Sequence, residues 1–494
     1  MNGVIKILIC FLPILILYSC FIEQKETQKE IAEIDSLVNK YIEINKFNGS
    51  LLVVKNNDII YERVCGLANP VTREKLTPDH RFRLASVTKQ FTGMAIMILK
   101  EDAKLDYDDN INKYLQELPY EGITIRHLLT HTSGLPDYGA LLDQHWDTTN
   151  ANTKNRKIAN NYIVYDHLVR YHPPVLFPPG EQYKYSNSGY NLLGLIIEKA
   201  SGMTYQEFMK IRVFEPLEMT NTFVNTADGI LPNEFRAHGF KINPADTGYL
   251  DIDRHYQNGM FGEGGIFTTT KDMFKYDQAL YTNTLISQKT LKDALLPGKL
   301  NDGKDINYGF GWSLIDNERG DFVAHGGGWT GFSTFFLRDY HHGNMIIQLT
   351  NRPGIRRGQL AFTIYEILHR GTYEMPKGSI AEVMLVEINK NGIEKAIQIY
   401  YDFKKKIFAD YDFSEPQLNS LGYQLLSQKR FNEAIRIFEE NVKLFPDSWN
   451  VYDSLAEAFM KSNDLEKATQ YYKESLRLNA DNENAEKMLQ KIRE

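Results

Sequence analysis

One serine in the chain is followed by a lysine three positions later, in the stretch Ser86-Val87-Thr88-Lys89, where an apolar-periodic segment begins. Positions i and i+3 share a face of a helix, so the Lys89 amine lies one turn from the Ser86 hydroxyl. A serine hydroxyl is a weak nucleophile until a neighbouring base takes its proton. The spacing predicts a helix from Ser86 to about Lys100 that carries a nucleophile and its base. An ordinary helix-start serine and a solvated lysine satisfy the same spacing.

Two later stretches add polar groups and glycines. Tyr185-Ser186-Asn187 lies in a proline- and glycine-rich segment, residues 177–190, just before a helical pattern. His325-Gly326-Gly327-Gly328 follows a strand-like run, residues 322–324. Glycine in a strand often marks the close approach of another backbone or of a ligand, although a bulge or turn explains it equally well. Tyr185 and Asn187 are therefore candidate site residues, as is the glycine run.

Together, the Ser-X-X-Lys, Tyr-X-Asn and His-Gly-Gly stretches resemble the motifs of the serine β-lactamase and penicillin-binding protein superfamily, especially its class C β-lactamase-like branch. They occur in the order in which that family carries them. Residues 127–136, His-Leu-Leu-Thr-His-Thr-Ser-Gly-Leu-Pro, are similar to this branch as well. The resemblance spans about residues 30–370, and it identifies this region as a serine hydrolase domain.

The resemblance implies a role for each residue. Ser86 attacks a carbonyl carbon and forms an acyl-enzyme, while Lys89 and Tyr185 act as one coupled proton relay. Which of the two is the base stays open, as it does across the superfamily. Asn187 binds the substrate amide and steadies Lys89. The backbone N–H groups of Ser86 and Gly328 form the oxyanion hole.

The third motif departs from the family pattern. Its relatives carry lysine and threonine where this chain has His325 and Gly326, and those two groups help to hold a substrate carboxylate. The resemblance still assigns substrate binding to His325, Gly326 and Gly327. Because neutral histidine holds an anion poorly and glycine has no hydroxyl, we expect an ester, a D-amino-acid peptide or a small amide as substrate in preference to a β-lactam.

The pattern of strands and helices predicts an α+β fold. Strand-like runs occur early in the domain and again near its end, with helical patterns between them, so we expect an antiparallel sheet built from both ends, flanked by helices and holding a helical insert. Residues 137–175 are polar, and we expect an irregular excursion there. The expected strands are 50–54, 59–63, 322–324, 333–338 and 345–349, and the expected helices include 23–46, 191–200, 205–213 and 359–368.

The last part of the chain has a different character. Beyond a linker at residues 371–378, glycine nearly vanishes, and segments 34 residues apart match: Gly422 with Ala456, and Phe438 with Tyr472. This period resembles the tetratricopeptide repeat. Residues 379–494 are therefore expected to form an all-α repeat domain, with further helices at 392–404 and 485–492. We expect such a domain to bind a protein or peptide or to pack against a neighbouring domain; a helical bundle without a partner is the alternative.

The N-terminal residues 1–19 have the features of a secretory signal. Lys6 precedes a mostly apolar run that ends Leu17-Tyr18-Ser19-Cys20, which resembles the lipobox of bacterial lipoproteins. We expect lipidation of Cys20, a tether at residues 20–29 and a membrane-anchored lipoprotein of the bacterial cell envelope. Plain secretion and an uncleaved anchor are the alternatives. Cys65 then has no partner for an intramolecular disulfide.

Several other functions are disfavoured. The net charge of −7 and the lack of a long basic run argue against nucleic acid as the main partner. His127 and His131 have helical spacing, but no glutamate follows His127 as in metallohydrolases, so we expect structural hydrogen bonds there. His341 and His342 are interpreted as turn residues. We expect no metal and no cofactor.

A second hypothesis is an inactive penicillin-binding-like domain whose repeats act as a binding or scaffold module. The presence of Ser86, Lys89, Tyr185 and Asn187 favours the enzyme over this alternative.

Overall fold

The computed structural model describes residues 24–147, 157–225, 235–242, 248–316, 322–353 and 356–493. The expected signal segment and Cys20 lie outside these residues. A helix covers residues 24–43, which agrees with the helix expected at 23–46 and includes the described part of the expected tether. Within the described ranges, no helix has both the length and the apolar character that crossing a bilayer requires.

The chain divides into two compact units. The first holds the residues up to Lys241 together with Tyr249–Glu374, and the second holds Ile242–Gly248 and Met375–Glu494. Each unit has a hydrophobic core of its own.

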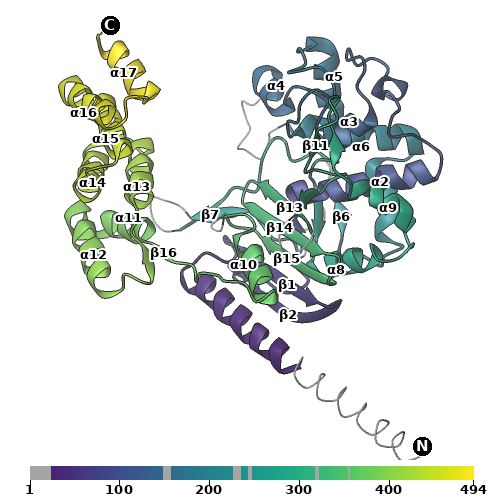
Figure 1. Ribbon diagram of the computed structural model, residues 1–494, viewed down its shortest axis with the longest axis horizontal. Coiled ribbons are helices and arrows are strands. Elements are labelled where there is room, and N and C mark those ends of the chain that lie inside the picture. The colour runs from purple at the N-terminus through teal and green to yellow at the C-terminus, as the bar shows by residue number, and fades with distance from the viewer. Residues whose placement is uncertain are drawn as a thin grey trace, which may run out of the picture. The chain divides into compact units, whose positions relative to one another are not determined.

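A six-stranded antiparallel sheet forms the frame of the first unit, with the strand order β12-β13-β14-β15-β1-β2 (Figure 1). β1 pairs with β2 on one side and with β15 on the other. The sheet is therefore closed by strands from both ends of the domain, and the predicted α+β class is confirmed. The strands are β1 (Gly49–Lys55), β2 (Asp58–Cys65), β12 (Ser313–Ile315), β13 (Phe322–Trp329), β14 (Phe332–Asp339) and β15 (Asn344–Thr350).

Helices occupy most of the chain between β2 and β12, as the predicted insert requires. The predicted closing helix, residues 359–368, is confirmed as α10. The helices of the first unit that follow β2 are α2 (Lys89–Glu101), α3 (Ile125–Leu129), α4 (Tyr138–His145), α5 (Asn161–Tyr171), α6 (Asn187–Ser201), α7 (Tyr205–Met209), α8 (Thr270–Ala279), α9 (Gln288–Ala294) and α10 (Gln359–Leu368).

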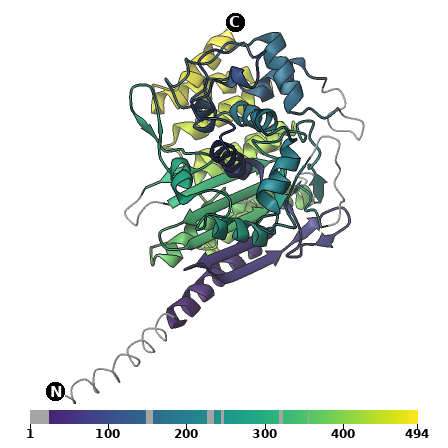
Figure 2. The ribbon, with the colours of Figure 1, turned by 90° about the vertical axis from the view of Figure 1, so that its right-hand side faces the viewer.

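The centre of the sheet is covered on both faces, and successive side chains of a strand contact opposite layers. Leu51 and Val53 of β1 pack with the helix of residues 24–43 and with α10. Leu52 and Val54 pack with the helical insert, including α2 and α6. Figures 1 and 2 show the sheet between these two layers. The central strands β1, β14 and β15 are accordingly buried along nearly their whole length.

The expected irregular excursion at residues 137–175 is wrong for its described part. This stretch contains α4 and α5, whose first turns are capped: Asp137 accepts a hydrogen bond from the Ala140 N–H, and Asn160 accepts one from the Ile163 N–H. Few of their side chains face the core, Val164 and Leu168 of α5 among them. The polar run that joins the two helices, residues 143–161, concealed this pattern.

Short ladders outside the main sheet position the loops around α2. β5 leads directly to Ser86 and pairs with β9, which follows a glycine-rich loop at residues 262–265. This pairing brings that loop beside the start of α2. The short strands are β3 (Leu67–Asn69), β4 (Glu74–Lys75), β5 (Phe82–Arg83), β6 (Phe223–Val224), β7 (Phe240–Ile242), β8 (Tyr249–Asp251), β9 (Ile266–Thr268), β10 (Gly298–Lys299) and β11 (Asp305–Ile306).

The second unit is a series of helices, as expected. Gly422 lies where two helices cross, because a Cβ on it would approach the Phe438 ring to 2.4 Å. Ala456 and Tyr472 are the matching residues one repeat later, and both are fully buried. The helices are α11 (Ile380–Asn391), α12 (Ile393–Lys406), α13 (Glu415–Ser427), α14 (Phe431–Leu444), α15 (Trp449–Lys461), α16 (Leu465–Leu478) and α17 (Glu483–Arg493), with a short parallel pair, β16 (Gly378–Ser379) and β17 (Tyr411–Asp412).

Candidate active site

Ser86 lies in a single 3₁₀ turn, Ala85–Thr88, that continues into α2 at Lys89. The predicted helix is therefore present, with a tighter first turn. Ala85 has φ +49°, in the left-handed region that costs a non-glycine residue about 1–2 kcal/mol. The strained residue lies where the chain turns from β5 into the helix. This turn fixes the position of Ser86.

The Lys89 side chain is fully buried and directed at three oxygen atoms. Its Nζ lies 3.3 Å from Ser86 Oγ, 2.8 Å from Asn187 Oδ1 and 2.9 Å from the Glu263 backbone oxygen. These partners come from the 3₁₀ turn, from the first residue of α6 and from the glycine-rich loop before β9. The ammonium form donates one hydrogen to each of them.

The same geometry orients the neutral amine. The two carbonyl oxygens, of Asn187 and Glu263, accept hydrogen bonds and have none to donate. A neutral Lys89 amine has two hydrogens, which these oxygens take, so its lone pair is directed at the Ser86 hydroxyl. The arrangement is suited to removing the proton from Ser86.

The Glu263 carboxylate balances the charge of Lys89 and was not identified from the sequence. Its Oε2 lies 3.8 Å from Lys89 Nζ, and its side chain is 5% exposed. The Tyr138 hydroxyl donates a hydrogen bond to Oε1 at 2.8 Å. Burial and the Glu263 charge raise the pKa of Tyr138 well above its usual value, so Tyr138 remains a donor. The only sequence signal was an acid inside a run of glycines.

Tyr185 and Asn187 flank the N-cap of α6. The Ser186 hydroxyl accepts the Gly189 N–H at 3.2 Å, which begins the helix at Asn187. The Tyr185 ring is 40% exposed, and its centroid lies 5.0 Å from Lys89 Nζ. An aromatic face stabilises a cation at this distance. The structure thus brings Tyr185, Asn187 and Lys89 together around Ser86, from segments about 100 residues apart.

His127 and His131 make the structural hydrogen bonds expected of them. His127 Nδ1 accepts the Thr124 N–H at 3.1 Å, which caps α3. His131 Nδ1 accepts the Ser186 N–H at 3.1 Å, and its ring packs 4.3 Å from that of Tyr185. Burial and the nearby Lys89 charge lower the pKa of His131 well below its usual value. A neutral His131 therefore supports the loop that carries Tyr185.

The glycine run of β13 lies against the turn that holds Ser86. A Cβ on Gly327 would lie 2.1 Å from the Leu84 backbone oxygen and 2.2 Å from Thr334 Oγ1. The Thr334 hydroxyl donates to the same Leu84 oxygen at 2.7 Å. Only glycine fits this approach, which brings the following residue, Gly328, to the edge of the site.

The His325 ring lies close to the site, with its centroid 6.2 Å from that of Tyr185. The side chain is buried; its Nδ1–H donates to the Gly326 oxygen at 2.9 Å, and Nε2 accepts the Tyr308 hydroxyl at 2.9 Å. Burial, followed by the charge of Lys89, lowers the pKa of His325 to about 3. The ring is neutral and both of its nitrogens are engaged, so it is not an anion-binding group.

Arg357 supplies a cation beside the glycine run and was also not identified from the sequence. A Cβ on Gly328 would lie 2.7 Å from Arg357 Nη1, so the guanidinium covers this end of β13. The side chain is exposed, and among the described residues none forms an ion pair with it. Its sequence signal was the pair Arg356-Arg357, just before α10.

Comparison with known families agrees with this geometry. The family model Beta-lactamase matches residues 34–366, and a Tetratricopeptide repeat model matches residues 425–492. The chain belongs to the beta-lactamase family, and it is a serine hydrolase with C-terminal tetratricopeptide repeats.

Individual relatives support this assignment. Penicillin-binding protein 4* of Bacillus subtilis (strain 168) is 37% identical over 335 residues, which are 66% of this chain and 72% of that protein. A penicillin-binding protein from Bacillus halodurans has a similar structure, with a TM-score of 0.57 and 27% identity over 68% of this chain and 97% of that one. The D-amino acid amidase from Ochrobactrum anthropi SV3 shares the fold, with a TM-score of 0.57 and 23% identity over 69% of this chain and 99% of that one.

The contact between β13 and the Ser86 turn gives a first prediction. Gly327→Ala places a methyl group against the Leu84 carbonyl and should displace β13 from Ser86. We expect turnover of a p-nitrophenyl ester to fall by about 100-fold or more, the loss typical of one missing oxyanion donor, together with a lower thermal midpoint. Gly326→Ala is the matched control, since its methyl group would meet the Phe335 ring at 3.4 Å, an ordinary contact. Equal activity of the two variants would contradict this account of β13.

Proposed function

We propose that this serine hydrolase cleaves D-amino-acid peptides or small esters through an acyl-enzyme on Ser86. The observation that carries the proposal is the Lys89 amine, held by two carbonyl oxygens with its remaining position toward Ser86 Oγ. In the first step, Lys89 takes the Ser86 proton while the oxygen attacks the substrate carbonyl carbon. The proton then passes to the leaving amine or alcohol. Water releases the acyl group in the second step, with the proton moving along the same groups.

Tyr185 is proposed to share the proton with Lys89. Its partly exposed ring lies next to the buried Lys89 amine, so a leaving group is expected to reach the Tyr185 hydroxyl more easily than the amine. Asn187 holds Lys89 and remains available for a substrate amide. The N–H groups of Ser86 and Gly328 are proposed to bind the oxyanion, where each donor is worth about 10²–10³ in rate.

Arg357 is proposed to hold the substrate carboxylate. The His325 ring is neutral and turned inward, so β13 offers no cation of its own. The Arg357 guanidinium lies beside Gly328, next to the proposed oxyanion hole, and is open to solvent. A guanidinium binds a carboxylate through two parallel hydrogen bonds. A peptide with a free C-terminal carboxylate is therefore the substrate that this site fits best.

The role of Lys89 is tested by Lys89→Ala. We expect acylation of Ser86 by a fluorophosphonate probe, and turnover of a small ester, to fall by about 10²–10⁴, the contribution of a positioned base. Lys100→Ala, on the same helix but at the surface, should keep both activities, and Ser86→Ala should lose labelling. If the probe fails to label the wild-type protein, and that protein still binds partners, the scaffold hypothesis is supported instead.

The role of Arg357 is tested by comparing two kinds of substrate. Arg357→Ala should lower kcat/KM about tenfold or more for a D-amino-acid dipeptide with a free carboxylate, because a hydrogen bond to a charged group is lost, and should leave its amidated counterpart unchanged. Arg356→Ala, the neighbouring exposed arginine, is the control. A parallel loss on both substrates would assign Arg357 to the fold and not to the carboxylate.

We also propose that the protein is exported and anchored through a lipid on Cys20. The support is the apolar N-terminal run that ends in a lipobox-like Leu-Tyr-Ser-Cys. In bacterial cells supplied with labelled palmitate, the wild-type protein and Cys65→Ser should carry the label and sediment with membranes. Cys20→Ser should lose both properties. If Cys20→Ser still carries the palmitate label, this proposal is wrong.

The repeat unit is proposed to bind a protein or peptide. Tetratricopeptide helices stack so that each repeat covers its neighbour and leaves one continuous surface for a partner. This role is separate from the chemistry at Ser86.

A further inference from the structure

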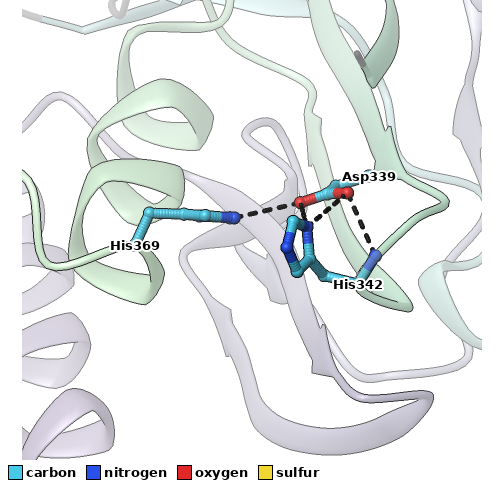
Figure 3. Close-up of side chains that lie close together, drawn as sticks. All are labelled: Asp339, His342 and His369. Carbon is cyan, nitrogen blue, oxygen red and sulfur yellow. Dashed lines mark hydrogen bonds and ion pairs between the residues drawn. The ribbon is translucent and has the colours of Figure 1, made fainter. Parts of the chain in front are cut away.

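Three side chains far from Ser86 come together at the opposite end of β14. Asp339 is the last residue of this strand, whereas Ser333, near its start, pairs with Gly328. His342 lies in the turn that joins β14 to β15, and His369 is the C-cap of α10. Figure 3 shows both imidazole rings directed at the Asp339 carboxylate.

The contacts are short and converge on one carboxylate. His342 Nδ1 lies 3.0 Å from Asp339 Oδ1 and 2.9 Å from Oδ2, and His369 Nε2 lies 3.0 Å from Oδ2. One ligand atom from each residue lies within 4.8 Å of the others. The side chains of Asp339 and His369 are 3% and 11% exposed, whereas that of His342 is 51% exposed, so the cluster is buried on one side and open to solvent on the other.

A second hydrogen bond of the His369 ring determines its neutral tautomer. His369 Nδ1 lies 2.9 Å from the Tyr365 backbone oxygen, which only accepts, so Nδ1 carries the hydrogen. In the neutral ring, Nε2 then has a lone pair, and it points at a carboxylate oxygen that also has only lone pairs. Two acceptors 3.0 Å apart repel each other unless a cation or a proton lies between them.

A divalent metal ion satisfies this arrangement without charging either ring. His342 can donate from Nδ1 in its neutral form, but His369 can donate only when it is protonated, whereas one ion accepts a lone pair from all three groups. A carboxylate and two imidazoles are ligands that Zn²⁺ takes in proteins, with a water in the fourth position. A backbone carbonyl that holds the far nitrogen of a ligating histidine, as Tyr365 does, is the usual support of such a site.

We propose that Asp339, His342 and His369 bind a zinc ion, with water completing the coordination from the exposed side of His342. Tetrahedral zinc bonds of about 2.0–2.1 Å require ligand atoms slightly farther apart than the present 2.9–3.0 Å contacts, and the exposed His342 ring has room to move outward. The ion would clamp the β14–β15 turn to the end of α10. The sequence had suggested only turn residues at 341–342 and no metal.

The test uses the full mature chain, stripped of metal with a chelator and titrated with Zn²⁺ against a chromophoric competitor. We expect one equivalent to bind, and the thermal midpoint to rise with zinc concentration, because an ion that binds only the folded state stabilises it. His342→Ala removes a half-exposed ligand and should weaken binding by about 100-fold or more, with loss of the zinc-dependent shift. His341→Ala, the neighbouring exposed histidine, is the matched control and should bind as the wild type does.

Other outcomes overturn the proposal. If His342→Ala and Asp339→Asn bind zinc with the affinity of the wild type, the zinc site lies elsewhere on the surface. A midpoint that rises only on acidification, with no response to zinc, shows that the cluster holds protons. If Asp339→Asn fails to fold, His342→Ala still decides, since its side chain lies at the surface. Substitution with Co²⁺ provides a second readout, because its visible absorption reports coordination and should be absent in His342→Ala.

Discussion

A buried amine with three oxygen partners is the constraint on which the rest of the catalytic unit depends. Lys89 is inaccessible to solvent, and a buried charge is tolerated only when hydrogen bonds and an opposite charge compensate it. Its partners come from the turn at Ser86, from Asn187 and from Glu263. Removing one member of a buried ion pair typically costs about 3–5 kcal/mol, so the fold and the site are stabilised by the same contacts.

Close packing of backbone against backbone holds these segments in place. Gly327 of β13 passes the Leu84 oxygen on one side of the Ser86 turn. On the other, Gly311, with φ +87°, lies against the start of α2, where a Cβ would come within 2.6 Å of the Lys89 backbone. Two segments therefore contact the turn directly, and each can approach this closely because it presents a glycine there. This packing explains how an unfavourable φ at Ala85 persists, because its surroundings leave no alternative.

Much of this arrangement could be predicted from the sequence, and the part that could not has a common cause. The order of the three motifs, the strands at both ends of the domain and the repeat period are local patterns, and each is confirmed. Glu263 and Arg357 gave little local signal, since their importance comes from the partners that tertiary packing brings to them. The same holds for His325: its position on the strand could be predicted, whereas the direction of its ring depends on Tyr308. The helices α4 and α5 were missed because a polar run, residues 143–161, separates them.

α10 connects the candidate active site to the proposed metal site. Arg357 precedes the helix and lies beside Gly328, while His369 ends it beside Asp339. A helix of ten residues is about 15 Å long and moves as a rigid body, so fixing one end restricts the other. Arg357 is an exposed side chain on the turn that precedes this helix. An ion that holds the far end of α10 would limit the movement of this turn and lower the entropy lost when Arg357 closes on a carboxylate. The two proposals concern separate sites, but the same helix makes them mechanically related.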